Sequence, residues 1–224
     1  MGMGHLMRCL TLAEALRERG AELLFITRKH EESLITLLRQ KAIPVRVLSA
    51  PLQPAVDTEN EDYANWLGVT QVEDVDQTIK ALNAKKPDWL VIDHYGLDVD
   101  WEKRIQEYVG KIMVLDDLAN RQHDCDILLD QNYSEKDELR YKGLIPDAGK
   151  LFVGPRYALL HSAYANHRKT LQVRDGQVKR VLVFFGGADS HNITGLALEA
   201  LSEPELSHLH VDVIIGPDNP HKQL

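Results

Sequence analysis

The chain has 224 residues, 34 acidic against 26 basic side chains, a formal net charge of −8 and 44% hydrophobic residues, which is enough apolar material for a buried core. Because it contains no run of Lys or Arg that could follow a phosphate backbone, we expect no nucleic-acid partner. Isolated cysteines predict reduced thiols, and short apolar runs without a basic leader predict a cytoplasmic protein that does not enter a membrane.

Short β-branched or aromatic runs alternate with stretches of helical period, a pattern that predicts βαβ units, a mostly parallel sheet and the α/β class. Leu6, Leu10, Ala13 and Leu16 lie on one face of a first helix that ends at Gly20. The strands expected before Tyr164 would form one sheet of about six strands. In chain order we expect a strand at 22–27, a helix at 31–41, a strand at 44–48, a helix at 72–85, a strand at 89–93, a helix at 101–108, and strands at 111–115, 127–129 and 151–153.

A polar and basic stretch without strong period, from Tyr164 to Gln177, predicts an interdomain connection. The expected domains are therefore 1–176 and 177–224. In the second, a strand at 180–185, a helix at 192–201 and a strand at 210–215 restart the βαβ pattern but are too few to close a core, which predicts a truncated domain. The first domain is expected to lack its leading strand, because a glycine loop that opens a helix normally follows a strand.

Two glycine-containing segments each precede a predicted helix. Gly2-Met3-Gly4-His5 would let a ligand approach backbone N–H groups, with His5 at the ligand's edge, although a plain turn with a helix-start histidine explains this segment alone better. Gly186-Gly187-Ala188-Asp189 has the geometry in which backbone donors face a pyrophosphate, and its alternative is also a turn. It lacks both the dinucleotide fingerprint and the P-loop lysine, so a nucleotide-sugar diphosphate remains compatible.

Polar residues also follow the predicted strands of the first domain. Asp93 and Tyr95 lie at a strand end, where open α/β sheets bind ligands, and capping of the next helix is an equal alternative. Asp116-Asp117 could orient a histidine or hold a metal, but the residues alone favour a turn. Asn132 could hydrogen-bond a sugar or simply start a loop.

A metal site is not predicted. Among the candidate ligands, His123, Cys125 and Asp126 have a spacing that matches no tight tetrahedral set, and a fourth ligand is not obvious. We therefore expect a protein without a bound metal.

Taken in order, several segments resemble the family of UDP-2,4-diacetamido-2,4,6-trideoxy-β-L-altropyranose hydrolases, which are related in fold to GT-B glycosyltransferases. The resemblance covers nearly the whole chain, and together these segments are far more specific than any single loop. The segments that carry it are Gly-Met-Gly-His-Leu-Met-Arg-Cys-Leu at 2–10, Leu-Asp-Asp-Leu-Ala-Asn-Arg at 115–121, Asp-Ile-Leu-Leu-Asp-Gln-Asn at 126–132, Gly-Pro-Arg-Tyr-Ala-Leu-Leu at 154–160 and Phe-Phe-Gly-Gly-Ala-Asp at 184–189.

The resemblance implies a GT-B-like fold of two Rossmann-type domains and removal of UDP from that sugar nucleotide by water attacking the anomeric carbon. This step belongs to pseudaminic acid biosynthesis, which serves flagellin glycosylation. The family's catalytic histidine matches His5, and Tyr95 would orient the water or a sugar substituent. We expect a monomer without a cofactor. Residues expected to bind the substrate are Gly2, Gly4, Arg8, Asp93, Asn132, Gly186, Gly187 and Asp189.

Two alternatives remain open at this point. A glycosyltransferase would use the same fold and donor but pass the sugar to an acceptor other than water. The absence of a basic amphipathic helix for a membrane-bound acceptor favours hydrolysis. The second alternative is an inactive nucleotide-sugar-binding fragment. Because the clamp between domains would be incomplete, the 224-residue form is expected to turn over far more slowly than an intact homologue.

Overall fold

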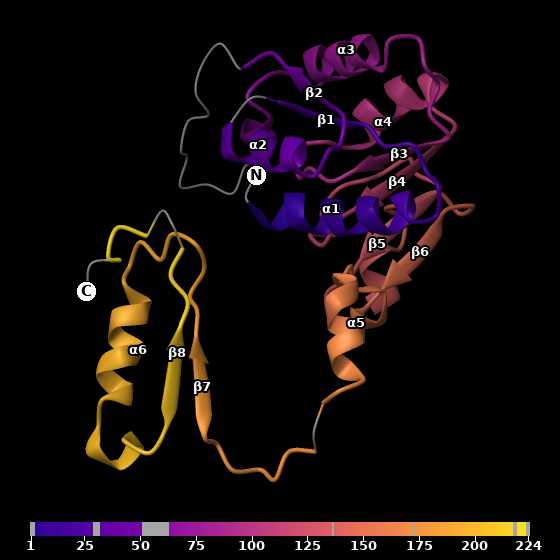
Figure 1. The fold of residues 1–224 in the computed structure, drawn as a ribbon. Coiled ribbons are helices and arrows are strands. Elements are labelled where there is room, and N and C mark those ends of the chain that lie inside the picture. The colour runs from indigo at the N-terminus through magenta and orange to yellow at the C-terminus, as the bar shows by residue number, and fades with distance from the viewer. Residues whose placement is uncertain are drawn as a thin grey trace. The chain divides into compact units, whose positions relative to one another are not determined.

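The computed structural model describes residues 3–28, 32–50, 63–135, 137–171, 173–216 and 219–222 (Figure 1). It forms two compact units, Met1–Ala165 and Asn166–Leu224. Within the described residues, no helix is both long enough and apolar enough to cross a membrane. The predicted α/β class is confirmed, because helices alternate with strands and every paired strand runs parallel to its neighbour.

The first unit contains two parallel sheets. One consists of β1 (Phe25–Arg28) and β2 (Val45–Leu48). The other has the strand order β3 (Trp89–Ile92), β4 (Lys111–Leu115), β5 (Ile127–Asp130) and β6 (Lys150–Val153). The helices of the first unit are α1 (Met3–Arg17), α2 (Glu32–Gln40), α3 (Gln71–Leu82) and α4 (Val99–Ile105), with 3-10 helices η1 (Tyr63–Leu67), η2 (Gln106–Tyr108), η3 (Asp137–Tyr141) and η4 (Pro155–Tyr157). Helix α5 (Ser162–Arg168) includes the boundary between the two units.

The expectation of one sheet is wrong for the described residues, because no backbone ladder joins β1 to β3. A hydrophobic run identifies a strand but not its neighbour, which depends on the backbone that comes alongside it in the folded chain. The two sheets nevertheless share apolar packing, since Ile26 of β1 contacts the main core.

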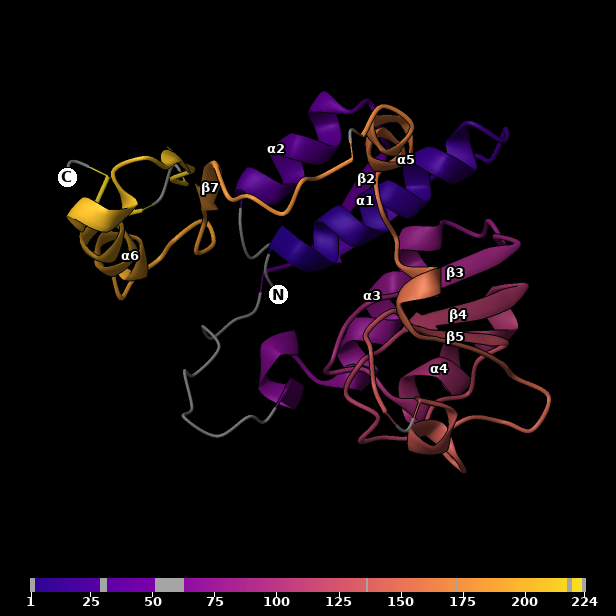
Figure 2. The ribbon, with the colours of Figure 1, turned by 90° about the horizontal axis from the view of Figure 1, so that it is seen from below.

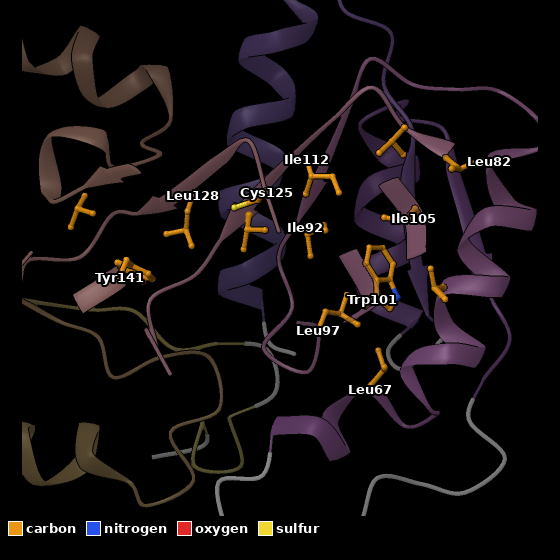
Figure 3. Close-up of a cluster of buried hydrophobic side chains, with 14 residues drawn as sticks. Leu67, Leu82, Ile92, Leu97, Trp101, Ile105, Ile112, Cys125, Leu128 and Tyr141 are labelled. Carbon is orange, nitrogen blue, oxygen red and sulfur yellow. The ribbon is translucent and has the colours of Figure 1, made fainter. Parts of the chain in front are cut away.

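The main core lies around β3, β4 and β5 (Figure 3). Helix α4 contributes Trp101 and Ile105, which are 3% and 0% exposed. Burying one such large side chain stabilises the fold by about 1.5–3 kcal/mol. The three strands contribute Ile92, Ile112 and Leu128, so this core holds three neighbouring strands in place.

A smaller core holds α1 and α2 together. Leu10 of α1 packs with Leu38 of α2 and with Ile43, which precedes β2. The predicted apolar face of the first helix is confirmed at Leu10 and Ala13, which are buried, whereas Leu16 is 38% exposed. Helix α1 is therefore held along its middle, and its first turn is available for other contacts.

The segment predicted as an irregular connection contains a helix, α5, at its start. Sequence periodicity did not reveal this helix because none of its residues is buried, so it has no apolar face. The predicted domain limit between 176 and 177 lies between α5 and β7 (Arg180–Val183) and stays a prediction.

The second unit has the predicted βαβ order: β7, α6 (Ile193–Leu201), η5 (Pro204–Leu206) and β8 (His210–Val213). Strands β7 and β8 pair in parallel, with Arg180 beside His210. Asn192 begins α6, because its side chain accepts a hydrogen bond from the N–H of Gly195. Both strands end before the predicted 185 and 215, at Val183 and Val213.

Helices α3 and α4 pack together (Figure 2), and a buried pair ties α4 to the connection between β4 and β5. Glu102 of α4 is 0% exposed and accepts hydrogen bonds from His123 Nδ1, at 2.7 Å, and from the N–H of Asp124. Asp126 accepts from the N–H of Ile112 at 2.9 Å. Two of the candidate metal ligands thus hold the fold together.

We predict that Glu102→Ala lowers the free energy of unfolding by about 3 kcal/mol or more, because it leaves the buried His123 and the partly buried N–H of Asp124 without their acceptor. Urea denaturation at neutral pH measures this change. The matched control is Glu107→Ala, an exposed position in η2, where the change should stay within about 0.5 kcal/mol. Equal effects of the two substitutions would contradict the structural role of Glu102.

Candidate active site

Helix α1 meets the end of β3 through the side chain of Asp93. His5 Nδ1 lies 2.7 Å from Asp93 Oδ1, and Arg8 approaches both carboxylate oxygens, with Nε at 2.7 Å and Nη2 at 2.5 Å. Cys9 Sγ donates to Oδ2 at 3.3 Å. Positions 5, 8 and 9 are three and four residues apart, so one helix face presents all three side chains.

Arg8 and His5 keep Asp93 ionised although its side chain is only 4% exposed. Burial by itself raises the pKa of a carboxyl, but hydrogen bonds from Arg8 and His5 outweigh burial here and lower the pKa of Asp93 below its ordinary value. Burial beside Asp93 raises the pKa of Cys9, which therefore remains a neutral thiol. Cys9 and Cys125 are both free, as predicted.

The contact with Asp93 assigns the tautomer of His5. An ionised carboxylate can only accept, so in a neutral His5 the 2.7 Å contact places the proton on Nδ1 and the lone pair on Nε2. Arg8 Nη2 lies 3.1 Å from the same Nδ1, and it donates instead to Asp93 Oδ1 at 2.5 Å. Nε2 makes no hydrogen bond to any residue that the structure describes, and the His5 side chain is 15% exposed. A histidine held in this way can act as an oriented base through Nε2.

A second carboxylate, Asp117, joins the remaining predicted residues of the first unit. Tyr95 donates its hydroxyl to Asp117 Oδ1 at 2.6 Å, and Asn132 Nδ2 donates to Oδ2 at 3.1 Å. Arg8 Nη1 is 3.4 Å from the same Oδ2. The Tyr95 ring stands edge-on to the His5 ring, with centroids 4.8 Å apart. Burial and the hydrogen bond to Asp117 raise the pKa of Tyr95 above its ordinary value, so its hydroxyl stays protonated.

The structure thus brings together His5, Arg8, Asp93, Tyr95 and Asn132, and adds Asp117, for which the sequence had favoured a turn. Its neighbour Asp116 does shape that turn, because Asp116 Oδ2 accepts from the N–H of Ala119 at 2.9 Å. The position of Asp117 after β4 could have indicated that it belongs to the site. Strand β4 lies directly beside β3, and parallel strands present their carboxyl ends at one edge of the sheet.

A layer of buried polar side chains holds the backbone of Asp117 in place. Arg140 of η3 donates to Asp130 Oδ2 at 2.9 Å and to the backbone oxygen of Asp117 at 2.8 Å. The hydroxyl of Tyr141 lies within 3.2 Å of both Asp116 and Asp130. Arg121 pairs with Asp116 at 2.6 Å. Each buried carboxylate therefore has a cationic partner, as stable burial of charge requires.

The predicted glycine loop differs in the structure. Gly4 lies within α1, which begins at Met3, so Gly4 and His5 belong to the first turn and not to a loop before it. A side chain at Gly4 would meet nothing within 4 Å. Close packing therefore does not require glycine there, and Gly2 lies outside the described residues.

The predicted diphosphate residues lie in the second unit. Gly186 has a φ of +81°, which favours glycine, and a Cβ on Gly216 would come 2.1 Å from the backbone oxygen of Gly187. Asp189 accepts hydrogen bonds from the N–H groups of Ile193 and Thr194, at 2.9 and 3.0 Å. Asp189 thus caps α6, and a ligand-binding role for these residues stays a prediction.

No group of three or more His, Cys, Asp or Glu side chains in the described residues is arranged to hold a metal ion. The carboxylates of the site instead bind arginine, histidine, tyrosine and asparagine side chains. Whether the protein works without a metal remains a prediction.

The lowered pKa of Asp93 gives a prediction for stability against pH. A carboxyl whose pKa is lower in the folded protein stabilises the fold above its unfolded pKa, about 3.9, and this contribution is lost as the pH falls through the folded pKa. Asp93→Asn should lower the free energy of unfolding at neutral pH, and that energy should then decline less than the wild-type value between about pH 5 and about pH 3.

Urea denaturation across this pH range tests the prediction. Asp147→Asn, at an exposed position, is the control and should follow the wild-type curve. Parallel curves for wild type and Asp93→Asn would contradict the role assigned to Asp93.

Comparison with known proteins gives three relatives, while no protein-family model matches the chain. The chain is 27% identical over 97% of its length to an uncharacterized protein of Methanocaldococcus jannaschii, of which it covers 40%. It is 31% identical over 66% of its length to the UDP-2,4-diacetamido-2,4,6-trideoxy-β-L-altropyranose hydrolase of Campylobacter jejuni, of which 52% is covered. It is 20% identical over 99% of its length to the spore coat polysaccharide biosynthesis protein SpsG of Bacillus subtilis, of which 58% is covered. The chain thus spans roughly half the length of these relatives and is related in sequence to proteins of nucleotide-sugar and polysaccharide biosynthesis.

Proposed function

We propose that the chain carries the catalytic part of a UDP-sugar hydrolase that releases UDP from UDP-2,4-diacetamido-2,4,6-trideoxy-β-L-altropyranose. The observation that supports this most strongly is the contact between His5 Nδ1 and Asp93 at 2.7 Å, which leaves Nε2 able to accept a proton. The relationship to the Campylobacter jejuni hydrolase supports the substrate class. The same proposal assigns the protein to pseudaminic acid biosynthesis in the cytoplasm, acting as a monomer without a metal.

In the proposed reaction, His5 Nε2 takes a proton from water as the water oxygen bonds to the anomeric carbon. The bond from that carbon to the UDP oxygen breaks, and its electron pair leaves with the diphosphate. Asp93 stabilises the imidazolium that forms, because its negative charge lies at hydrogen-bond distance from Nδ1. Arg8 keeps Asp93 ionised for this task.

Tyr95 and Asn132 are proposed to position the sugar and the water. The Tyr95 hydroxyl is neutral and fixed on Asp117, so its oxygen can accept a hydrogen bond from the water or a sugar substituent. Asn132 uses its Nδ2 on Asp117, and its carbonyl oxygen is suited to an acetamido N–H or a hydroxyl group. Charged acceptors alone would discriminate less well between such neutral groups.

The diphosphate is proposed to bind to the backbone N–H groups of Gly186 and Gly187 in a second domain that starts at 177. These glycines follow β7 and precede α6, the usual place for a phosphate in a βαβ unit. The substrate-binding roles of Gly2, Gly4 and Asp189 belong to the same proposal.

Substitution of His5 tests the proposed chemistry. His5→Asn should lower kcat for UDP release by ~10²–10⁴-fold, because the proton acceptor is lost, and should leave KM nearly unchanged. Release of UDP by the 224-residue chain is followed without any added sugar acceptor, and His167→Asn, on the exposed helix α5, is the control. A His5→Asn variant as fast as wild type would contradict the proposal, and UDP release that requires an added acceptor would indicate a glycosyltransferase instead.

A further inference from the structure

Three aromatic side chains form a cluster that begins beside His5. The Tyr95 ring, next to His5, is 5.1 Å from the Tyr63 ring, and Tyr63 is 4.9 Å from Trp66. Trp66 is also 6.0 Å from Tyr95, so the three rings form one cluster. We call Tyr63, Trp66 and Tyr95 the aromatic cluster.

Two independent contacts fix the position of η1, which carries Tyr63 and Trp66. Leu67 is 4% exposed and belongs to the main core. At the other end of η1, the backbone oxygen of Tyr63 packs against Gly96, where a Cβ would lie only 2.7 Å away. Residue 96 must therefore be glycine for η1 to approach the loop after β3. These two contacts of η1 therefore hold the aromatic cluster in place beside His5.

Trp66 exposes 40% of its surface although the cluster offers it apolar neighbours. The polar groups nearby belong to the site itself: the Tyr95 hydroxyl is bound to Asp117, and His5 is bound to Asp93. An exposed indole that contacts Tyr95, the neighbour of His5, combines an apolar surface with a few polar groups, which is the composition of small-molecule sites.

We propose that the aromatic cluster binds the apolar face of the sugar ring of the nucleotide sugar, with Trp66 as the main contact, an inference that rests on the proposed function. The ring spacing supports the sugar over the uracil. The anomeric carbon must lie next to His5 during the reaction, and the cluster begins 4.8 Å from the His5 ring. The uracil is separated from that carbon by a ribose and two phosphates, so it lies too far away.

The chemistry of the sugar fits these rings. Two of the three missing hydroxyl groups are replaced by acetamido groups, whereas position 6 is left as a methyl group. That methyl group and the neighbouring ring C–H groups form an apolar part of the sugar. The faces of aromatic rings are partly negative and attract such weakly positive C–H groups. A sugar with a full set of hydroxyls would gain less from this surface, which makes Trp66 a specificity-determining residue.

Calorimetric titration of Trp66→Ala tests the proposal. It is made in the His5→Asn chain, which should bind the sugar nucleotide without consuming it. The probes are UDP-2,4-diacetamido-2,4,6-trideoxy-β-L-altropyranose and UDP alone. Trp66→Ala should weaken binding of the sugar nucleotide about tenfold and leave binding of UDP unchanged, because UDP has no sugar ring to contact the indole. Trp66→Phe should restore part of the affinity.

Trp89→Ala is the matched control, because Trp89 is 43% exposed and lies at the start of β3, at the opposite end of the strand from Asp93. It should leave both affinities unchanged. Unchanged affinity of Trp66→Ala for the sugar nucleotide, an equal loss for both probes, or no binding of the sugar nucleotide by the parent chain would overturn the proposal. Turnover in the wild-type chain is measured separately: unaltered activity of His5→Asn would refute the proposed base, whereas the binding comparison alone decides the role of Trp66.

Discussion

The buried carboxylate of Asp93 is the constraint on which the candidate site depends. It lies at the end of β3, and three side chains of α1 converge on it. Without Arg8, burial would favour a neutral carboxyl at this position, and a neutral carboxyl would no longer hold the proton of His5 on Nδ1. The charge of Arg8 is thus linked through Asp93 to the proton-accepting atom of His5.

The parallel sheet explains why residues far apart in the sequence meet. Strands β3, β4 and β5 are neighbours, and the polar residues Asp93, Asp117 and Asn132 follow them within two positions. Since parallel strands present their carboxyl ends at one edge, each additional strand brings another loop to the same place. The apolar core beneath the strands sets the spacing of these loops, and the arginine-paired Asp116 and Asp130 fill the layer between core and site.

Much of the fold was predictable, because strand formation follows local apolar runs. The expected strand at 111–115 has the observed bounds, and the helix face of Leu10 and Ala13 is buried as expected. The division into two sheets was not predictable, because it depends on backbone pairing between distant segments. Helix α5 escaped prediction since it buries no residue and therefore leaves no apolar period.

The candidate site was only partly readable from the sequence. Strand-end position made Asp93, Tyr95 and Asn132 candidates, and the family resemblance made His5 one, but neither gave their pairing. Which carboxylate contacts His5 depends on how α1 lies against the sheet. An Asp-Asp pair at a strand end has the same local sequence pattern whether it shapes a turn or belongs to a site. Asp116 shapes the turn, and Asp117 belongs to the candidate site. The aromatic residues of η1 lie outside the segments that carry the family resemblance. Their contact with Tyr95 could be found only from the structure.

The tautomer of His5 is the property on which the proposed chemistry rests most directly. Long-range ¹H–¹⁵N correlation spectra of the ¹⁵N-labelled chain distinguish the two neutral tautomers of each histidine, and the signal missing from His5→Asn identifies that of His5. At a pH where His5 is neutral, the wild-type chain is expected to carry the proton on Nδ1, and Asp93→Asn should lose this preference. A His5 protonated on Nε2 in the wild-type chain would contradict the assignment, because the atom proposed to accept the proton of water would already carry one.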